Sequence, residues 1–374
     1  MRVLLTGGGT AGHINPALAI AEIIKENDPS AVIEFVGIRT GKEADLVPRE
    51  GYRLHFVRSM GIKRSLSPSN IKALWLALRS PKLKETQKIL DDFQPDIVIG
   101  TGGYASWPIM KAAADRGIPT AIHESNAIPG MTVKRLQKHV DMIWTNFEAT
   151  ANDLKTQDKV HRVGNPLRAQ FDHCTAEQAK KELGFSADQR LLLSFGGSMG
   201  ASTVNSAVLE LMKEFSAKNP NVIHVHATGK RDFESTRARF CELGLDAYSN
   251  CRIVDYIYQM PLYMSASDAV ISRAGAMTVS ELAHQQKPAI LIPSPFVADN
   301  HQFKNAKALA DRNAAILVEE KDLSSNALTD AVERLFQDTA LCETLKRNIA
   351  EFSDPDVGRH IWKDIQALLE KTKG

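Results

Sequence analysis

Two glycine turns, each placed directly after a short apolar run, are the residues best suited to chemistry. Residues 2–12 read Arg-Val-Leu-Leu-Thr-Gly-Gly-Gly-Thr-Ala-Gly, and residues 191–201 read Leu-Leu-Leu-Ser-Phe-Gly-Gly-Ser-Met-Gly-Ala. Such a turn between a strand and a helix directs backbone N–H groups and the positive end of the helix at one position, which suits an anion, often phosphate. Because one turn lies in each half of the chain, we expect two nucleotide-binding folds that bring two substrates together.

His13 stands directly after the first turn and is a candidate general base. The positive end of the predicted helix favours the neutral imidazole over the charged form. A neutral imidazole is the form that can accept a proton from a sugar hydroxyl. A histidine that only caps or packs the helix is the alternative.

Polar residues follow two further apolar runs in the first half. Residues 100–104, Gly-Thr-Gly-Gly-Tyr, come after the run 96–99, and the polar stretch 123–130 comes after the run 119–122. Open α/β sheets bind ligands at the carboxyl ends of their strands. We therefore expect both segments to line a ligand cleft, with purely structural hydrogen-bonded turns as the alternative.

The second half carries a comparable set of segments. Residues 272–281 open a helix with small side chains and place Glu281 in its first two turns, where a carboxylate can accept both hydroxyl groups of a ribose. Residues 299–302, Asp-Asn-His-Gln, open another helix after the run 289–293. We expect these segments to converge with residues 196–200 on one ligand. The alternative for Glu281 is an acid that only favours the helix dipole.

A dinucleotide-binding enzyme is a competing interpretation of the first turn. Gly7, Gly9 and Gly12 match the G-x-G-x-x-G fingerprint, which also requires an acidic residue at the end of the second strand. Here the run 32–36 is followed by Gly-Ile-Arg, with no acid. Arg39 could instead suit a 2′-phosphate, so an NADP-dependent oxidoreductase stays open.

Short apolar runs alternate with helix-like stretches along the whole chain, which predicts an α/β fold with doubly wound parallel sheets. The expected strands of the first half are 2–6, 32–36, 54–57, 96–99, 119–122, 141–145 and 160–163. Those of the second half are 191–195, 222–227, 251–254, 268–272, 289–293 and 314–318. We expect a hinge at residues 164–168, which separates domains 1–164 and 165–352. The tail 353–374 is expected to form an amphipathic helix that either caps the second domain or crosses back to the first.

Composition sets the broad class of the protein. A chain of 374 residues favours two domains, and a net charge of +2 gives no reason to expect nucleic acid. The four cysteines lack metal-binding spacing and are expected to be reduced thiols. No secretory leader and no apolar run long enough to span a membrane can be fitted, so we expect a cytoplasmic protein that could still touch a membrane surface.

Taken together, the motifs resemble those of one enzyme family. Residues 8–16, 123–130, 196–198 and 274–281 are similar, in order and spacing, to the peptidoglycan N-acetylglucosaminyltransferases of the GT-B fold. The resemblance implies two Rossmann-like domains that face each other across a cleft. It also implies that GlcNAc passes from UDP-GlcNAc to the 4-hydroxyl of the muramoyl sugar of lipid I, with inversion, to give lipid II. The N-terminal domain would hold the acceptor and the C-terminal domain the donor.

The resemblance also implies roles for individual residues. His13 is the candidate base, with Glu124 as the second candidate. The implied acceptor-binding residues are Gly102, Gly103 and Tyr104. The implied donor-binding residues are Thr10, Ala11, Gly12, Asn126, Arg168, Ser198, Ile257, Ala276, Met277, Thr278, Val279, Ser280, Glu281 and Gln302.

No cofactor and no site metal are expected. Negative charge develops on UDP as it leaves, and backbone N–H groups with Arg168 can stabilise that charge. The single Asp-x-Asp, at 354–356, is interpreted as a helix cap. The expected partners are UDP-GlcNAc, lipid I, the anionic cytoplasmic surface of the membrane and other cell-wall synthesis proteins. Another GT-B glycosyltransferase or a UDP-GlcNAc 2-epimerase is the alternative within this fold.

A membrane-docking surface is expected in the first domain, because the implied acceptor is anchored in lipid. Four apolar residues fall on one helical face at i, i+3, i+4 and i+7, and basic residues surround them. This combination suits an anionic leaflet, and the protein would then be peripheral on the cytoplasmic side of the cell membrane. A core-facing helix with solvated lysines is the alternative. The apolar residues are Ile71, Leu74, Trp75 and Leu78, and the basic ones are Lys63, Arg64, Lys72, Arg79, Lys82, Lys84 and Lys88.

Overall fold

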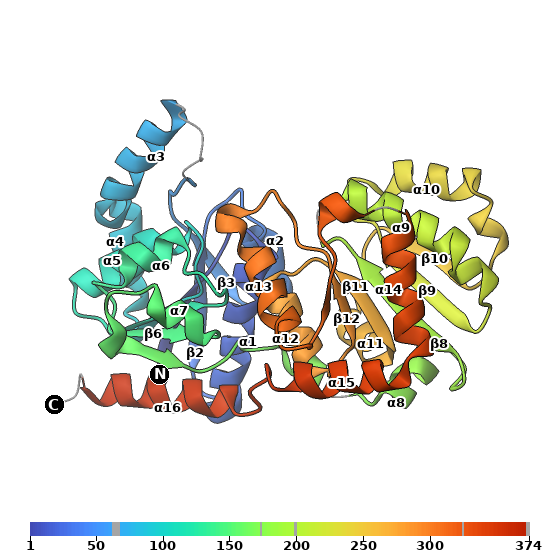
Figure 1. Ribbon diagram of the computed structural model, residues 1–374. Coiled ribbons are helices and arrows are strands. Elements are labelled where there is room, and N and C mark those ends of the chain that lie inside the picture. Colours follow the sequence, from blue (N-terminus) through green and yellow to red (C-terminus); the bar gives the residue numbers. More distant parts are fainter. Residues whose placement is uncertain (62–67, 173, 198–199, 324, 372–374) are drawn as a thin grey trace. The chain divides into compact units, whose positions relative to one another are not determined.

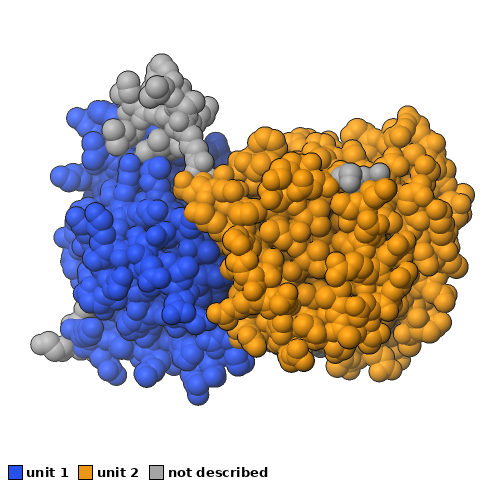
Figure 2. Space-filling model, viewed as in Figure 1, with its two compact units in different colours: residues 1–169, 354–374 blue, residues 170–353 orange. Residues whose placement is uncertain are grey.

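The computed structural model describes residues 1–61, 68–172, 174–197, 200–323 and 325–371, and Figure 1 shows its helices and strands. The chain divides into two compact units (Figure 2). Unit 1 comprises Met1–Ala169 and Asp354–Gly374, and unit 2 comprises Gln170–Ser353. The boundary thus falls directly after the segment 164–168, where the sequence indicated a hinge.

Unit 1 is built on a seven-stranded sheet in which every paired strand runs parallel to its neighbour, in the order β3-β2-β1-β4-β5-β6-β7. The order reverses at β1 and β4, which is the topological switch point of a doubly wound sheet. All seven strands expected in the first half are present, with ends shifted by at most two residues. They are β1 (Arg2–Thr6), β2 (Val32–Gly37), β3 (Arg53–Phe56), β4 (Ile97–Gly100), β5 (Thr120–Glu124), β6 (Met142–Thr145) and β7 (Val160–Arg162).

Both faces of this sheet are covered by helices. Val3 and Leu5 of β1 pack into one apolar cluster, whereas Leu4 packs into another, because consecutive strand residues point to opposite faces. Leu4 is therefore as fully buried as its neighbours, which explains the continuous apolar runs in the sequence. The helices over the first cluster are α1 (Ala11–Asn27), α2 (Glu43–Arg49) and α16 (Val357–Lys371), and those over the second are α4 (Lys84–Phe93), α5 (Ser106–Asp115) and α6 (Met131–Leu136).

Helix α16 belongs to unit 1 although unit 2 precedes it in the chain (Figure 1). It packs along α1 and buries Ile361, Ile365 and Leu368. Asp364 fixes it to the sheet, since its carboxylate accepts hydrogen bonds from Trp144 Nε1 and from the ring of His161, both at 2.9 Å. Of the two placements considered from the sequence, the structure therefore shows the return to the first domain.

Unit 2 contains a six-stranded parallel sheet in the order β10-β9-β8-β11-β12-β13. Its strands match the six expected runs, again within two residues at each end. They are β8 (Arg190–Phe195), β9 (Val222–Ala227), β10 (Cys251–Val254), β11 (Ala269–Ser272), β12 (Ala289–Leu291) and β13 (Ile316–Leu317). Its helices are α8 (Ala176–Glu182), α9 (Ser202–Glu214), α10 (Phe233–Glu242), α11 (Met260–Ala266), α12 (Ala276–His284), α13 (His301–Ala310), α14 (Ser325–Gln337) and α15 (Thr339–Ala350).

The remaining helices of unit 1 are α3 (Pro68–Arg79) and α7 (Glu148–Asn152). Helix α3 projects from the body of the unit (Figure 1). Within the described part of the chain, no helix combines the length and apolar character needed to cross a bilayer.

Candidate active site

The carboxyl ends of β1, β4 and β5 bring the first-half candidates together in unit 1. Thr10 precedes α1, so Ala11, Gly12 and His13 form the first turn of that helix. Gly102 and Gly103 follow β4 and contact His13 closely: a Cβ atom on Gly102 would lie 3.0 Å from His13 Nδ1, and one on Gly103 would lie 3.2 Å from His13 Cδ2. The first glycine turn and the turn at residues 102–103 therefore meet at His13 within unit 1.

The hydrogen bond of His13 determines which ring nitrogen is available. His13 Nδ1 lies 3.0 Å from the carbonyl oxygen of Thr101. A carbonyl only accepts hydrogen bonds, so Nδ1 carries the proton and donates it. Nε2 of the neutral ring then keeps its lone pair, as a general base requires.

Gly102 and Gly103 also shape an amide-rich turn before α5. Their φ angles are +92° and +77°, which favour glycine. A Cβ on Gly103 would lie only 2.3 Å from the carbonyl oxygen of Gly8. The N–H groups of Gly102, Gly103 and Tyr104 donate to no acceptor in the described ranges, so they can receive an anion.

Glu124, the second candidate base, is used as an internal anchor. Oε1 accepts from the amide and the side chain of Asn126, both at 3.0 Å, and Oε2 accepts from the amide of Gly130 at 2.7 Å. The side chain is buried. The carboxylate thus holds the loop after β5 in shape and presents Asn126, while His13 has the nitrogen free for proton transfer.

His123 corrects one expectation for this loop. We expected residues 123–130 to line a cleft, but His123 lies inside β5 and is fully buried. Its Nε2 donates to the carbonyl oxygen of Gly164 at 2.9 Å. Burial lowers its pKa to about 4, so it stays neutral and links the sheet to the hinge segment.

Glu43 is a site residue that sequence reasoning missed. It begins α2 and is fully buried, and its two carboxylate oxygens accept from Gly9 N at 2.9 Å and from Ile38 N at 3.0 Å. The end of β2 has no acid, as the sequence indicated, but this acid six residues later reaches back to the first glycine turn. The Gly9 amide is thus occupied by Glu43. The turn therefore has fewer N–H groups available for an incoming anion than its glycine content indicated. The signal in the sequence is the Gly37–Gly41 pair, because a Cβ at either position would lie within 2.4 Å of the Glu43 side chain.

Arg168 is paired within unit 1. Its guanidinium contacts the carboxylate of Glu22 in α1 and that of Glu50 after α2, the latter at 2.8 Å. Glu22 also accepts from the amide of Ala169 at 3.0 Å, at the end of the hinge segment. These contacts do not place Arg168 with the glycine turns, and its role at a diphosphate stays a prediction.

The carboxyl ends of β8, β9, β10, β11 and β12 hold the second-half candidates in unit 2. Gly197 and Gly200 of the second glycine turn have φ angles of +89° and +79°. A Cβ on Gly200 would lie 2.5 Å from the carbonyl oxygen of Thr228, so this turn packs against the loop after β9. Ser198, a predicted donor-binding residue, lies outside the described residues.

Helix α12 carries the segment from Ala276 to Glu281 that the sequence assigned to a nucleotide. Its first turn follows Gly275, whose extended backbone starts the helix. The side chain of Glu281 is partly exposed, yet desolvation raises its pKa to about 7. The group can therefore exchange a proton near neutral pH, and as a carboxylate it can accept ribose hydroxyls.

Two further features extend the same edge of the sheet. Gln302 in the first turn of α13 accepts from the amide of Ser294 through Oε1 at 2.8 Å, so its oxygen is engaged within unit 2. Ile257 is buried between two exposed tyrosines, and the rings of Tyr256 and Tyr258 meet edge to face at 5.0 Å. Lys230 lies 5.8 Å and 5.5 Å from these two rings. The resemblance predicted a role for Ile257, which stays a prediction, and gave no sign of these aromatic and cationic neighbours.

The acidic pair near the C-terminus behaves as a cap. Asp354 Oδ1 accepts from the amide of Asp356 at 2.8 Å, directly before α16. Across the described ranges, no three His, Cys, Asp or Glu side chains cluster in a way that could hold a metal ion.

Comparisons with known proteins identify both halves of the chain. The N-terminal domain model of glycosyltransferase family 28 matches residues 3–145, and the C-terminal domain model of that family matches residues 191–359. A relative from Thermoanaerobacter sp. is 38% identical over 98% of this chain and all of its own length. It is named UDP-N-acetylglucosamine–N-acetylmuramyl-(pentapeptide) pyrophosphoryl-undecaprenol N-acetylglucosamine transferase.

Solved structures agree with this assignment. Acinetobacter baumannii MurG is 25% identical, with a TM-score of 0.73 over 98% of this chain and 99% of that one. The UDP-GlcNAc 2-epimerase from Neisseria meningitidis, solved with UDP-GlcNAc bound, gives a TM-score of 0.68 at 14% identity over 98% of this chain and 100% of that one. The second likeness is one of fold alone.

Proposed function

The chain belongs to glycosyltransferase family 28, and from that premise we propose that it transfers GlcNAc from UDP-GlcNAc to the 4-hydroxyl of the muramoyl sugar of lipid I, with inversion, to form lipid II. The observation that carries the proposal is the 38% identity, over 98% of the chain, to a transferase whose name states this donor and this acceptor. The enzyme is thus a UDP-GlcNAc-dependent glycosyltransferase. Family membership also excludes the interpretation of the first glycine turn as part of an NADP-dependent oxidoreductase.

The acceptor reaction is assigned to unit 1. His13 Nε2 takes the proton of the 4-hydroxyl as that oxygen bonds to the anomeric carbon of GlcNAc. The carbonyl of Thr101 holds the ring and favours the protonated imidazole that forms, since it already accepts from Nδ1. The amides of Gly102, Gly103 and Tyr104 supply donors for the diphosphate of the lipid-linked acceptor. Glu124 is a positioning residue that presents Asn126.

The donor is assigned to unit 2. As the bond between GlcNAc and UDP breaks, negative charge grows on the β-phosphate, and the second glycine turn with the N-terminus of α9 stabilises it. Glu281 binds the ribose, the backbone at Ile257 reads uracil, and the amide of Gln302 contacts the GlcNAc hydroxyls. We expect this charge stabilisation to need no metal ion, and an undiminished rate in the presence of a chelator tests that expectation.

The membrane is proposed as the place where the enzyme meets its acceptor. Trp75 and Leu78 of α3 are 54% and 68% exposed, which is unusual for large apolar side chains. Arg79, Lys82 and Lys84 accompany them in the chain. We propose peripheral binding to an anionic cytoplasmic leaflet through this surface, with other cell-wall synthesis proteins as further partners. Ile71 and Leu74 were predicted on the same face, but their side chains lie outside the described residues.

The decisive experiment measures UDP release from UDP-GlcNAc with lipid I, with a soluble muramoyl analogue and without acceptor. The transferase proposal expects release that depends on acceptor and a product that contains both sugars. Release of UDP or formation of a 2-epimer without acceptor would favour the epimerase alternative and contradict the proposal.

A further inference from the structure

A chain of buried hydrogen bonds runs through the sheet of unit 2 and ends at the loop that contacts the second glycine turn. Its members are Ser216, His224, Ser194, His226, Asn205 and Thr228, and every one of their side chains is buried. Ser216 Oγ and Ser194 Oγ each lie 2.9 Å from a ring nitrogen of His224. Ser194 Oγ also lies 2.8 Å from His226 Nδ1, and His226 Nε2 lies 3.1 Å from Asn205 Oδ1.

The far end of the chain fixes the direction of all its hydrogen bonds. Asn205 Nδ2 lies 3.0 Å from the carbonyl oxygen of Thr228, which can only accept. Asn205 Oδ1 must then accept from His226 Nε2, so a neutral His226 accepts at Nδ1 from the Ser194 hydroxyl at 2.8 Å. The Ser194 carbonyl oxygen, which lies farther from the same nitrogen at 3.2 Å, then receives no hydrogen from it. By the same reasoning Ser194 accepts from His224 Nε2, and His224 Nδ1 accepts from Ser216. Burial keeps both rings neutral, and it lowers the pKa of His226 to about 4 and that of His224 well below 6.5.

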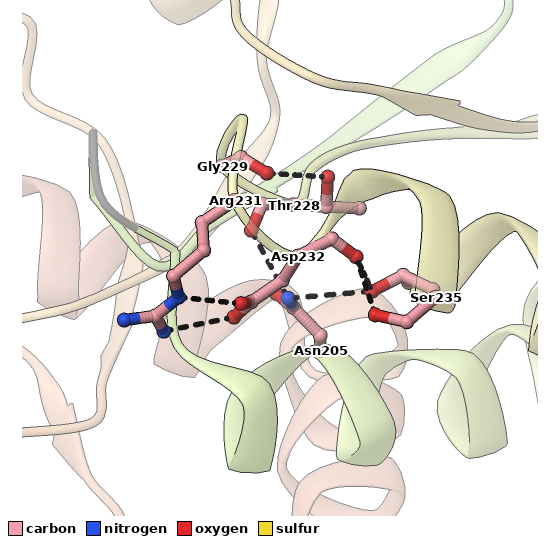
Figure 3. Close-up of polar contacts among 7 residues, drawn as sticks. Asn205, Thr228, Gly229, Arg231, Asp232 and Ser235 are labelled. Carbon is pink, nitrogen blue, oxygen red and sulfur yellow. Dashed lines mark hydrogen bonds and ion pairs between the residues drawn. The ribbon is translucent and has the colours of Figure 1, made fainter.

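The loop at the end of this chain touches the glycine turn. The Thr228 carbonyl oxygen, which accepts from Asn205, would lie 2.5 Å from a Cβ atom placed on Gly200. Asp232 Oδ2 would lie 3.1 Å from the same Cβ atom. Figure 3 shows Asn205 reaching this loop from α9, with the guanidinium of Arg231 on Asp232 at 2.7 Å and 3.2 Å. Asn205 lies in the first turn of α9, directly after the glycine turn, and its amide donates to the carbonyl oxygen of Ala201 at 2.8 Å.

We propose that Asn205, held by the buried Ser216–His224–Ser194–His226 chain, is a positioning residue for the diphosphate of the sugar nucleotide. It fastens the 228–232 loop to α9 and thereby sets the conformation of the glycine turn at Gly200. The residue touches no reacting atom and acts through the turn. The proposal rests on the proposed function, because it assumes that this turn receives UDP.

The test compares Asn205→Leu with Asn250→Leu in the full-length enzyme. Asn250 is the comparison: it is buried directly before β10 and donates to the backbone carbonyls of Ser216, Asn219 and Val222 at 2.7 Å, 3.3 Å and 2.9 Å. It lies at the amino-terminal end of the strands, and its side chain meets the buried hydrogen-bond chain at the backbone of Ser216. His226→Leu, which removes the donor to Asn205 Oδ1, is the second test variant. Folding is checked by circular dichroism, steady-state kinetics give KM and kcat, and calorimetry gives the Kd of UDP.

In folded Asn205→Leu we expect the KM for UDP-GlcNAc and the Kd of UDP to rise about fivefold or more, the scale of one or two lost hydrogen bonds, with kcat within about twofold of the parent. His226→Leu should shift both in the same direction, and Asn250→Leu should shift neither. Unchanged KM and Kd in folded Asn205→Leu, an equal rise in Asn250→Leu, or failure of both test variants to fold would overturn the proposal. If the unmodified enzyme binds no UDP, the proposed function itself is wrong, which separates the two failures.

Discussion

At the scale of single residues, the arrangement around His13 separates a proton acceptor from the groups that hold it. The ring donates from Nδ1 to Thr101, Gly102 and Gly103 pack against it, and the carboxylate of Glu124 is occupied by backbone and side-chain amides. His13 and Glu124, the two candidates for the base, therefore serve different purposes.

His13→Ala should lower kcat by about 10²-fold to 10⁴-fold, the usual range for loss of a general base, while the Kd of UDP stays near the parent value. Rates with saturating lipid I and calorimetry with UDP measure the two quantities. Glu124→Gln is the comparison, since its effect should include a loosened loop and therefore a raised KM. A His13→Ala enzyme with parental kcat would exclude His13 as the base.

Gly103→Ala should impair the enzyme far more than Gly117→Ala. Both glycines have positive φ, +77° and +70°, so each substitution costs about 1 kcal/mol or more of backbone strain. Only Gly103 also faces an obstacle, the Gly8 carbonyl at 2.3 Å, whereas a Cβ on Gly117 would meet nothing within 4 Å. Melting temperatures and lipid I turnover of the two variants check this, and equal behaviour would contradict the crowded geometry.

Glu281 should make uridine binding depend on pH. Its pKa of about 7 in the free protein leaves part of it protonated near neutrality, and the ionised form accepts ribose hydroxyls better. Binding then lowers this pKa, so the affinity for uridine should increase as the pH rises from 6 to 8. Calorimetry with uridine, which has no phosphate to titrate, tests this, with Glu281→Gln as the pH-insensitive control. A flat profile in the unmodified protein would contradict the ribose contact.

At the scale of elements, the sequence predicted the thirteen strands found in the described residues, because parallel strands covered on both faces read as continuous apolar runs. The glycine turns were found because positive φ and close backbone approach demand glycine. Glu43 and the buried histidines were missed for the opposite reason, since long-range hydrogen bonds leave no local pattern. The choice between His13 and Glu124 likewise needed the Thr101 carbonyl, 88 residues from His13 in sequence.

The buried histidines of β9, His224 and His226, should make the stability of unit 2 sensitive to acid. An unfolded histidine titrates near pH 6.5, whereas buried His226 titrates at about pH 4, so between these values the unfolded state binds more protons. The stabilising contribution is complete above pH 6.5 and falls as the pH drops towards 4, by about 3 kcal/mol for His226 alone. Relative to His226→Gln, the parent should lose unfolding free energy between pH 7 and pH 5 in urea titrations. If the difference in unfolding free energy between the parent and His226→Gln is constant with pH, His226 does not have the lowered pKa.

At the scale of the whole molecule, the exposed Trp75 and Leu78 are the side chains expected to bind the membrane that carries the acceptor. Trp75→Ser with Leu78→Ser should weaken binding to anionic vesicles at least about tenfold, because each large apolar side chain contributes roughly 1.5–3 kcal/mol when it leaves water. Tyr248→Ser, an exposed aromatic in unit 2, is the control and should bind as the parent does. Sedimentation with vesicles measures this, and unchanged binding of the folded double variant would remove α3 as the docking element.

The return of α16 to unit 1 has a consequence for biosynthesis. Residues 170–353 must all be translated before the helix that covers α1 leaves the ribosome. A nascent chain therefore keeps the side of α1 around Ile23 uncovered while the whole second unit is being made. Chaperone contact with that stretch should end only after α16 has left the ribosome and packed against α1.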